Sequence, residues 1–200
     1  MKPPEAKRID TRREYHGDVF IDPYEWLRDK ADPEVAAYLE AENAYADAVM
    51  KPTEGFQESL YVEMLARIKE DDQTVPYRRR GFFYYSRTEK GKQYPIYCRK
   101  AGGLDAPEQV MLDLNALAVG HPFLALGAAS VSDDGRLLAY TTDLTGFREY
   151  TLHVKDLETG ALLPERVEKV SAVAWAADGE TLFYVTEDEA KRPYLSLIHI

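Results

Sequence analysis

The sequence predicts a mainly β protein, an incomplete β-propeller of about two and a half blades preceded by a helical segment. Three observations support this prediction. Up to about residue 72, apolar residues recur with helical spacing. From residue 73 onward, short runs rich in β-forming residues alternate with turn residues. Within this second part a turn-and-strand pattern recurs at a fixed distance, which is typical of proteins built from repeated structural units.

Two helices are predicted in residues 1–72. Asp32 and Pro33 provide an N-cap followed by proline at the first helical position. Apart from the polar Glu42, one face of the helix that follows carries Val35, Leu39, Tyr45 and Val49. A second helix is expected to begin at Thr53, and one of its faces carries Phe56, Leu60, Met64 and Ile68. Both helices are amphipathic and therefore need a partner surface.

Two aromatic residues, Tyr24 and Trp26, precede the first helix. We expect them to lie in a loop and to anchor the helices by core packing, because large aromatic side chains contribute most when they are buried.

Five strands are predicted after residue 73, at residues 82–86, 94–98, 137–140, 150–154 and 182–185. Four polar turns separate them, at residues 89–92, 134–135, 158–160 and 178–179. Each turn contains a glycine, which supplies the positive φ that such turns often require.

The repeat is clearest in two stretches, SDDGRLLAYTT from Ser132 and AADGETLFYVT from Ala176. Corresponding residues lie 44 positions apart, as Tyr140 and Tyr184 illustrate. A period of about 40–50 residues that carries four strands is the signature of a propeller blade. We expect one blade up to about residue 125, a second up to about residue 170 and a third that is partial. Because propellers close with roughly four to eight blades, we interpret the chain as a fragment.

The composition excludes several classes of function. A net charge of −10 and a pI near 5.0 disfavour nucleic-acid partners. The basic run Arg78-Arg79-Arg80 is expected to be a solvated loop. No apolar run reaches the roughly 18 residues of a membrane span, and the charged N-terminus lacks a secretory signal. The single cysteine, Cys98, fits a reducing, cytoplasmic setting, and we expect a half-buried thiol that is not a nucleophile.

The search for chemistry yields no catalytic, cofactor-binding or metal-binding residue. A serine hydrolase elbow, G-x-S-x-G, is absent around all six serines, Ser59, Ser86, Ser130, Ser132, Ser171 and Ser196. The four histidines are too far apart in sequence to show the short spacing of metal ligands; they are His16, His121, His153 and His199. His153 has Asp156 three residues on, a spacing that puts the two on opposite faces of a strand. His121 is expected in a turn.

Two further motifs receive structural interpretations. The acidic run Glu70-Asp71-Asp72 is expected at a solvated helix end, facing a loop or a basic partner, because carboxylates at a helix C-terminus oppose its dipole. Gly102-Gly103 is interpreted as part of a hairpin and not as a phosphate-binding loop.

Several segments of the sequence resemble a known family. The segments that carry the resemblance are DPYEWLRD from Asp22, DPEVAAYLEAENAY from Asp32, EMLARIKEDDQTVPYRRRGFFYYSRTEKGKQYPIYCRK from Glu63, GHPFLALGAASVSDDGRLLAYTTD from Gly120 and YTLHVKDLETG from Tyr150. They are similar to the N-terminal part of the prolyl oligopeptidase family of serine peptidases. The RIKEDDQTVPY segment resembles the oligopeptidase B branch. The resemblance extends from about residue 10 to Tyr194.

The resemblance implies a fold and an activity. In the family a seven-bladed propeller covers an α/β-hydrolase domain, to which the first segment of the chain also belongs. Residues 1–72 would then belong with the hydrolase domain, and residues 73–200 would form about two and a half of seven blades. The resemblance implies a cytoplasmic peptidase that cuts short peptides after Arg or Lys, with the propeller as a lid that excludes folded proteins. The Ser, Asp and His of the family lie in the C-terminal domain, beyond residue 200.

Two alternatives to this reading stay open at the level of sequence. One is a non-catalytic binding module made of blades, and the other is a parent enzyme that cleaves after proline. The final residues, Leu195-Ser196-Leu197-Ile198-His199-Ile200, depart from the blade pattern, and we interpret them as foreign sequence at a truncation. We expect the 200-residue chain alone to be inactive.

Overall fold

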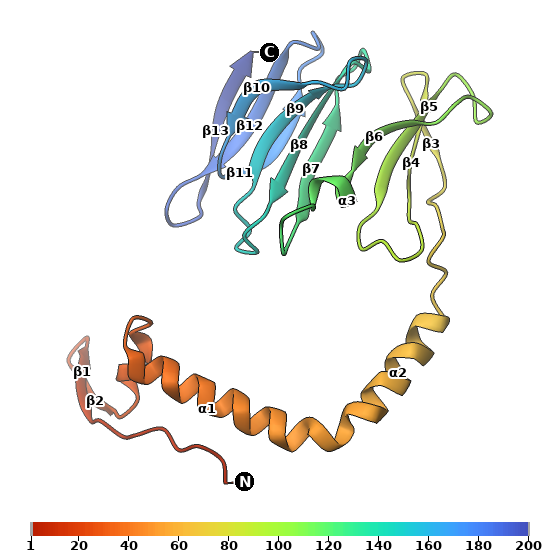
Figure 1. The fold of residues 1–200 in the computed structure, drawn as a ribbon. Helices are drawn as coiled ribbons and strands as arrows, with labels where there is room; N and C mark the ends of the chain where they lie inside the picture. Colours follow the sequence, from red (N-terminus) through yellow and green to blue (C-terminus); the bar gives the residue numbers. More distant parts are fainter. Residues whose placement is uncertain (1, 200) are drawn as a thin grey trace. The chain divides into compact units, whose positions relative to one another are not determined.

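The computed structural model describes the backbone of residues 2–199 and the side chains of residues 2–193. Figure 1 shows its elements, which fall into two units, Met1–Ile68 and Lys69–Ile200. The interpretation of residues 195–200 as foreign sequence concerns side chains that lie outside the described ones. None of the described helices has the length and the apolar composition of a membrane span.

The first unit begins with a hairpin that the sequence analysis did not predict. Strand β1 (Thr11–Tyr15) pairs antiparallel with β2 (Asp18–Asp22), and Thr11 lies opposite Asp22. The turn between them uses positive φ values, 52° at His16 and 89° at Gly17. The expectation of a purely helical segment was therefore wrong for these residues. Strand β1 has the sequence TRREY, which gives little apolar alternation from which a strand could be recognised.

The two predicted helices are present. Helix α1 (Pro33–Met50) follows the short 3-10 turn η1 (Glu25–Arg28), and the carboxylate of Asp32 caps it by accepting the Glu34 N–H at 2.8 Å. A second 3-10 turn, η2 (Lys51–Thr53), leads into α2 (Glu54–Ala66). Helix α2 therefore begins one residue after the predicted Thr53.

Only one of the two aromatic residues before α1 anchors that helix. The Trp26 indole donates to the Lys7 carbonyl at 3.0 Å and meets the Tyr38 ring of α1 edge-on at 6.2 Å. Tyr24, by contrast, is 44% exposed. Several apolar residues of the helices are also exposed, and they include Leu39, Val49, Phe56, Leu60 and Met64, as is Ile68 just after α2.

The second unit contains three antiparallel sheets that follow one another along the chain (Figure 1). The first has the order β3 (Tyr77–Arg79), β4 (Phe82–Arg87), β5 (Ile96–Ala101), β6 (Gln109–Asp113). The short helix α3 (Leu114–Leu117) leads to the second, β7 (Ala125–Val131), β8 (Leu137–Asp143), β9 (Thr151–Asp156), β10 (Leu162–Val167). The third contains β11 (Val170–Trp175), β12 (Thr181–Glu187) and β13 (Pro193–His199). The predicted arc of about two and a half blades is confirmed.

The repeated turns have matching conformations. Gly135 and Gly179 have φ values of 81° and 73°. In each turn the preceding aspartate accepts backbone N–H groups, from Arg136 to Asp134 at 3.0 Å and from Thr181 to Asp178 at 2.8 Å. Asp and Gly are therefore needed together, one to bond the turn and the other to adopt its backbone conformation.

Strand β8 supplies two hydrophobic cores. All seven of its residues are buried. Leu138 and Tyr140 pack with residues of the first blade, whereas Leu137 and Ala139 pack with residues of the third, such as Leu182. Alternate residues of a strand point to opposite faces, so the second blade is covered on both sides.

Arg99 of β5 joins the first blade to the second. This side chain is 3% exposed, and its guanidinium donates to the Gly135 carbonyl and to Gln109 Oε1. The same group lies 4.1 Å from the centre of the Phe82 ring. A buried guanidinium is costly unless its donors are bonded, and these contacts bond it without a carboxylate.

Gly135→Ala tests how closely the two blades approach. A Cβ at Gly135 would lie 2.7 Å from Phe82 Cε2, whereas a Cβ at Gly160 meets nothing within 4 Å. Both glycines have positive φ, 81° and 78°. We expect Gly160→Ala to cost about 1–2 kcal/mol of unfolding free energy from backbone strain, and Gly135→Ala about 1–3 kcal/mol more from overpacking. Urea unfolding of both variants measures the difference, and equal losses would contradict the close approach.

Candidate functional site: the polar network beside the first blade

Residues 70–74, which we call the lead-in segment, lie beside the C-terminal end of β4. The Thr88 N–H donates to the Asp72 carbonyl at 2.8 Å, and the Thr74 N–H donates to the Ser86 carbonyl at 2.9 Å. The Thr88 hydroxyl donates to the Glu70 carbonyl at 2.5 Å and accepts the Asp72 N–H at 3.3 Å. These hydrogen bonds, together with that from the Ser86 N–H to the Thr74 hydroxyl at 2.9 Å, hold this segment to the first blade.

The acidic run of the lead-in segment faces a loop, as expected. Asp71 Oδ1 accepts the Lys90 N–H at 2.7 Å, and Lys69 forms an ion pair with Asp72 at 2.7 Å. Helix α2 ends at Ala66, so the carboxylates lie beyond its last turn. The Asp71 carboxylate bonds the loop between β4 and β5, and the expected position at a helix end was wrong, so the run does not oppose the helix dipole within the helix.

Proline interrupts the pairing between the lead-in segment and β3. Gln73 lies opposite Arg87, and Tyr77 lies opposite Tyr84, so the strand that runs into β3 holds one residue more than β4 between these pairs. Pro76 falls in this bulge and has no N–H to donate. For this reason β3 has only three residues.

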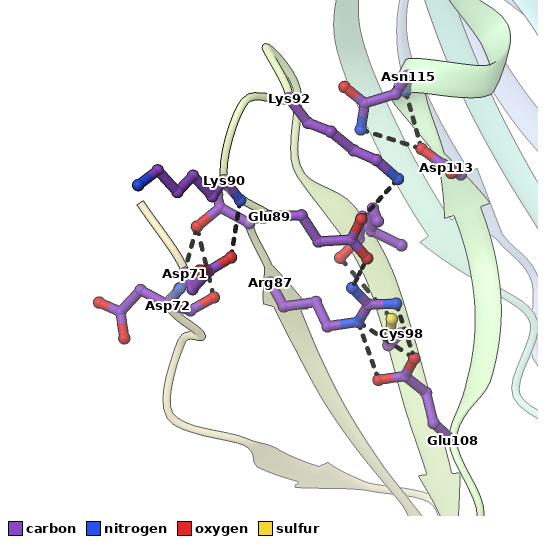
Figure 2. A network of polar contacts seen from close by, with 12 residues as sticks. Asp71, Asp72, Arg87, Glu89, Lys90, Lys92, Cys98, Glu108, Asp113 and Asn115 are labelled. Atoms are coloured by element: carbon purple, nitrogen blue, oxygen red, sulfur yellow. Dashed lines mark hydrogen bonds and ion pairs between the residues drawn. The ribbon is translucent and has the colours of Figure 1, made fainter. Parts of the chain in front are cut away.

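Figure 2 shows that Arg87 lies between two carboxylates. Its Nε donates to Glu108 at 3.1 Å, and its Nη1 forms an ion pair with Glu89. Lys92 bonds Glu89 from the other side at 2.6 Å. The Tyr85 hydroxyl donates to Glu108 at 2.5 Å. The network thus joins β4, the loop after β4 and the residue just before β6.

The pKa shifts within the network favour its charged form. Lys92 first and then Arg87 lower the pKa of Glu89. Burial alone would raise the pKa of Glu108, but the hydrogen bonds from Tyr85 and Arg87 outweigh it and the pKa is lowered. The pKa of Arg87 is raised by Glu89 and then Glu108. The carboxylates stay ionised and the guanidinium stays protonated near neutral pH. The network therefore holds these parts of the first blade together by ion pairs and is not suited to acid–base catalysis.

Cys98 lies beneath the network and is fully buried, which corrects the expectation of a half-buried thiol. Burial, followed by the nearby Glu108, raises its pKa to about 11. A thiol with that pKa is protonated at neutral pH and is a poor nucleophile. The sequence interpretation of Cys98 as non-catalytic therefore agrees with its surroundings.

The structure does not bring the histidines together. His16 lies in the β1–β2 turn, and the His121 N–H donates to Ala118 in the turn after α3. His153 stacks on Tyr140 at 5.3 Å and contacts the Thr142 hydroxyl at 3.2 Å. The side chain of His199 lies outside the described side chains. Among the described residues, no group of three His, Cys, Asp or Glu side chains could hold a metal ion.

Two other sequence interpretations have structural outcomes. Gly102 and Gly103 lie in the connection between the antiparallel strands β5 and β6, as expected for part of a hairpin, and the Gly102 N–H donates to the Gly81 carbonyl at 2.8 Å. The expected loop at Arg78-Arg79-Arg80 was wrong in part, because Arg78 and Arg79 belong to β3 and pair with Phe83 and Phe82. All three arginines are nevertheless exposed.

Three side chains with central polar contacts, Arg87, Glu108 and Arg99, were not singled out from the sequence. Arg99 could have been noticed, because it lies two residues after Tyr97 and therefore on the same face of the strand as that aromatic ring. The pairing of Arg87 with Glu108 had no local signal, because 21 positions separate the two residues.

Comparison with known proteins identifies relatives of the whole chain. Residues 3–197 match the family described as "Prolyl oligopeptidase, N-terminal beta-propeller domain". The chain is 45% identical to dipeptidyl aminopeptidase BI of Pseudoxanthomonas mexicana, over 93% of the chain and 28% of that protein. It is 42% identical to protease 2 of Moraxella lacunata, over 96% of the chain and 29% of that protein. The chain thus spans less than a third of the length of these relatives.

A solved structure has the same fold. Oligopeptidase B from Trypanosoma brucei, in its closed form with covalently bound antipain, superposes on 100% of this chain and 31% of its own, with a TM-score of 0.88 and 28% identity.

Thr88→Val tests the attachment of the lead-in segment. The variant removes the hydroxyl that accepts the Asp72 N–H, so we expect amide exchange at Asp72 to accelerate about tenfold. The Thr74 N–H, which donates to the Ser86 carbonyl, is an internal control and should exchange at an unchanged rate. Equal acceleration at both amides would mean that the variant loosens the whole blade.

Glu108→Gln tests the electrostatic part of the network. Because folding lowers the pKa of Glu108, its ionised form adds stability above the ordinary value of 4.5, and this is lost as the pH falls through the lower pKa of the folded state. We expect the variant to be roughly 1 kcal/mol less stable at pH 7 and the gap to shrink towards pH 3. Urea unfolding across pH measures this. Glu158→Gln, at an exposed turn position, is the control, and a gap independent of pH would contradict the assignment.

Proposed function

Because the chain belongs to the prolyl oligopeptidase family, we propose that it is the N-terminal part of a serine-type oligopeptidase that cuts short peptides after Arg or Lys. One observation carries the proposal: the likeness of the entire chain to oligopeptidase B, with a TM-score of 0.88. The 42% identity to protease 2 supports the same assignment.

In this proposal, residues 73–200 form part of a propeller that covers the active site as a lid. Two complete blades and three strands of another are present among the described residues, and propeller blades surround a central channel. A ring of blades over an active site would admit short peptides and exclude folded proteins. The polar network beside the first blade would keep the start of the propeller fixed during this function.

Residues 1–72 would pack against a hydrolase domain that follows the propeller. The support is the exposure of large apolar side chains on α1 and α2, such as Phe56 at 70% and Met64 at 58%. Amphipathic helices of this kind are covered by another surface in stable proteins. The serine, histidine and aspartate of the reaction would come from that domain. A cytoplasmic location belongs to the same proposal, since the buried Cys98 needs no oxidising compartment.

A panel of internally quenched peptides tests the specificity. The peptides differ at one position, which is Arg, Lys, Pro or Ala, and each is offered with a free and with a blocked N-terminus. For the whole protein that contains these residues, we expect kcat/KM for Arg and Lys to exceed that for Pro and Ala at least a hundredfold, with a serine-directed reagent abolishing cleavage. Residues 1–200 alone should cleave none of the peptides.

Other outcomes would select a different function. Preference for Pro would indicate a prolyl-specific parent. Release of dipeptides from free N-termini alone would match the name of the 45% identical relative, dipeptidyl aminopeptidase BI. Absence of cleavage of every peptide by the whole protein would overturn the peptidase assignment and favour a binding module.

A further inference from the structure

A pocket of about 150 Å³ opens between the first and second blades. Its walls come from both blades, and its apolar lining includes the buried side chains of Tyr84, Met111 and Leu138. Tyr77 and Arg79 of β3 also line it, and both are exposed. Strands β3 and β7 are the first strands of their blades, and in a propeller these lie nearest the central channel.

The size and lining of the pocket suit one large apolar side chain. An apolar cavity of about 150 Å³ is known to hold a benzene molecule. Here the lining combines aromatic rings with a methionine, whose flexible side chain adapts to different shapes. Tyr77 stacks on Tyr84 with their ring centres 5.6 Å apart, which leaves an exposed aromatic face beside the pocket.

The neighbouring junction shows how a protein side chain covers the equivalent space. Between the second and third blades, Trp175 of β11 packs in the shared core and donates its indole N–H to the Ser130 carbonyl at 2.9 Å. At the first junction the corresponding residue, 44 positions earlier, is Val131 of β7, a smaller side chain that lines the pocket. The first junction therefore keeps space that the second junction fills.

The charges beside the pocket favour an anion. Arg80 pairs with Asp133 at 2.8 Å, and Arg79 reaches the same carboxylate at the longer distance of 3.5 Å. Two guanidinium groups thus share one carboxylate, and Arg79 is the more weakly held. A guanidinium in this position can form a bidentate, charge-assisted pair with a second carboxylate.

We propose that this pocket binds the C-terminal residue of a peptide, with an aromatic or large aliphatic side chain among Tyr84, Met111 and Leu138 and the α-carboxylate against Arg79. An apolar group and a carboxylate on one small ligand are what the C-terminal residue of a peptide offers. The inference rests on the proposed function in one respect, because it takes peptides as the molecules that enter the propeller. It adds that peptides are recognised at their C-terminus.

Binding of a peptide that lacks Arg and Lys tests the pocket independently of cleavage. The probe is dye-labelled Gly-Ser-Gly-Ser-Phe, and its binding to the whole protein is measured by fluorescence anisotropy. Two peptides serve for comparison, the C-terminal amide of the probe and a version that ends in Ala. We expect the amide to bind at least fivefold more weakly and the Ala peptide at least tenfold more weakly.

Matched variants locate the site. Arg79→Gln should remove the difference between the acid and the amide, and Arg79→Lys should retain part of it. Arg78→Gln, on the same strand but paired with Phe83 on the other face of the blade, should leave the difference intact. Ala129→Leu, which fills the pocket from β7, should weaken binding of the Phe peptide at least tenfold. Ala174→Leu, at an exposed position of β11, is its control.

The outcomes separate this inference from the proposed function. Tight binding of the acid with no cleavage after Arg or Lys would support the pocket and overturn the peptidase specificity. Cleavage after Arg or Lys, together with equal binding of acid and amide, would overturn the pocket alone. Equal loss of binding in the Arg78 and Arg79 variants would show a general charge effect and would also overturn the assignment.

Discussion

The burial of β8 on both of its faces is the constraint on which the arrangement of the blades depends. A sheet with two apolar faces cannot be stable alone in water, because one face would remain exposed. Leu138 and Tyr140 complete a core with the first blade, and Leu137 and Ala139 complete one with the third. Each blade is therefore both a part of one core and a cover for the next. This relation explains why the sequence repeats: each unit must offer the same surfaces to its neighbours.

Apolar contact alone would not fix how one blade sits on the next, because hydrophobic attraction is non-directional. Hydrogen bonds between the blades, which are directional, fix their relative position. Arg99 bonds the Gly135 carbonyl, Lys155 bonds the Met111 carbonyl at 3.0 Å, and Trp175 bonds the Ser130 carbonyl. In each case a long side chain of one blade reaches the backbone of another. A backbone acceptor is present whatever side chain it carries, so such contacts tolerate sequence change in the partner blade.

The features that could be predicted from sequence are those encoded by neighbouring residues. The Asp134-Gly135 turn and the Asp32 cap each need only two or three adjacent positions, and both are present. The hairpin at β1 was missed because TRREY carries no apolar alternation. The burial of Cys98 and the pairing of Arg87 with Glu108 could not be inferred, because they arise when distant strands meet. The same reason applies to the pocket, which two blades build together.

Two arginines at the first junction illustrate how burial separates structural from binding roles. Arg99 is 3% exposed and bonded to neutral acceptors, so it is out of reach of a ligand and its loss would leave a gap between blades. Arg79 is exposed and shares Asp133 with Arg80, so its charge is only partly neutralised. A guanidinium that is rigidly satisfied stabilises the fold, whereas one that is loosely held beside an apolar pocket can exchange its partner. The junction therefore combines a fixed contact at its buried side with an available charge at its open side.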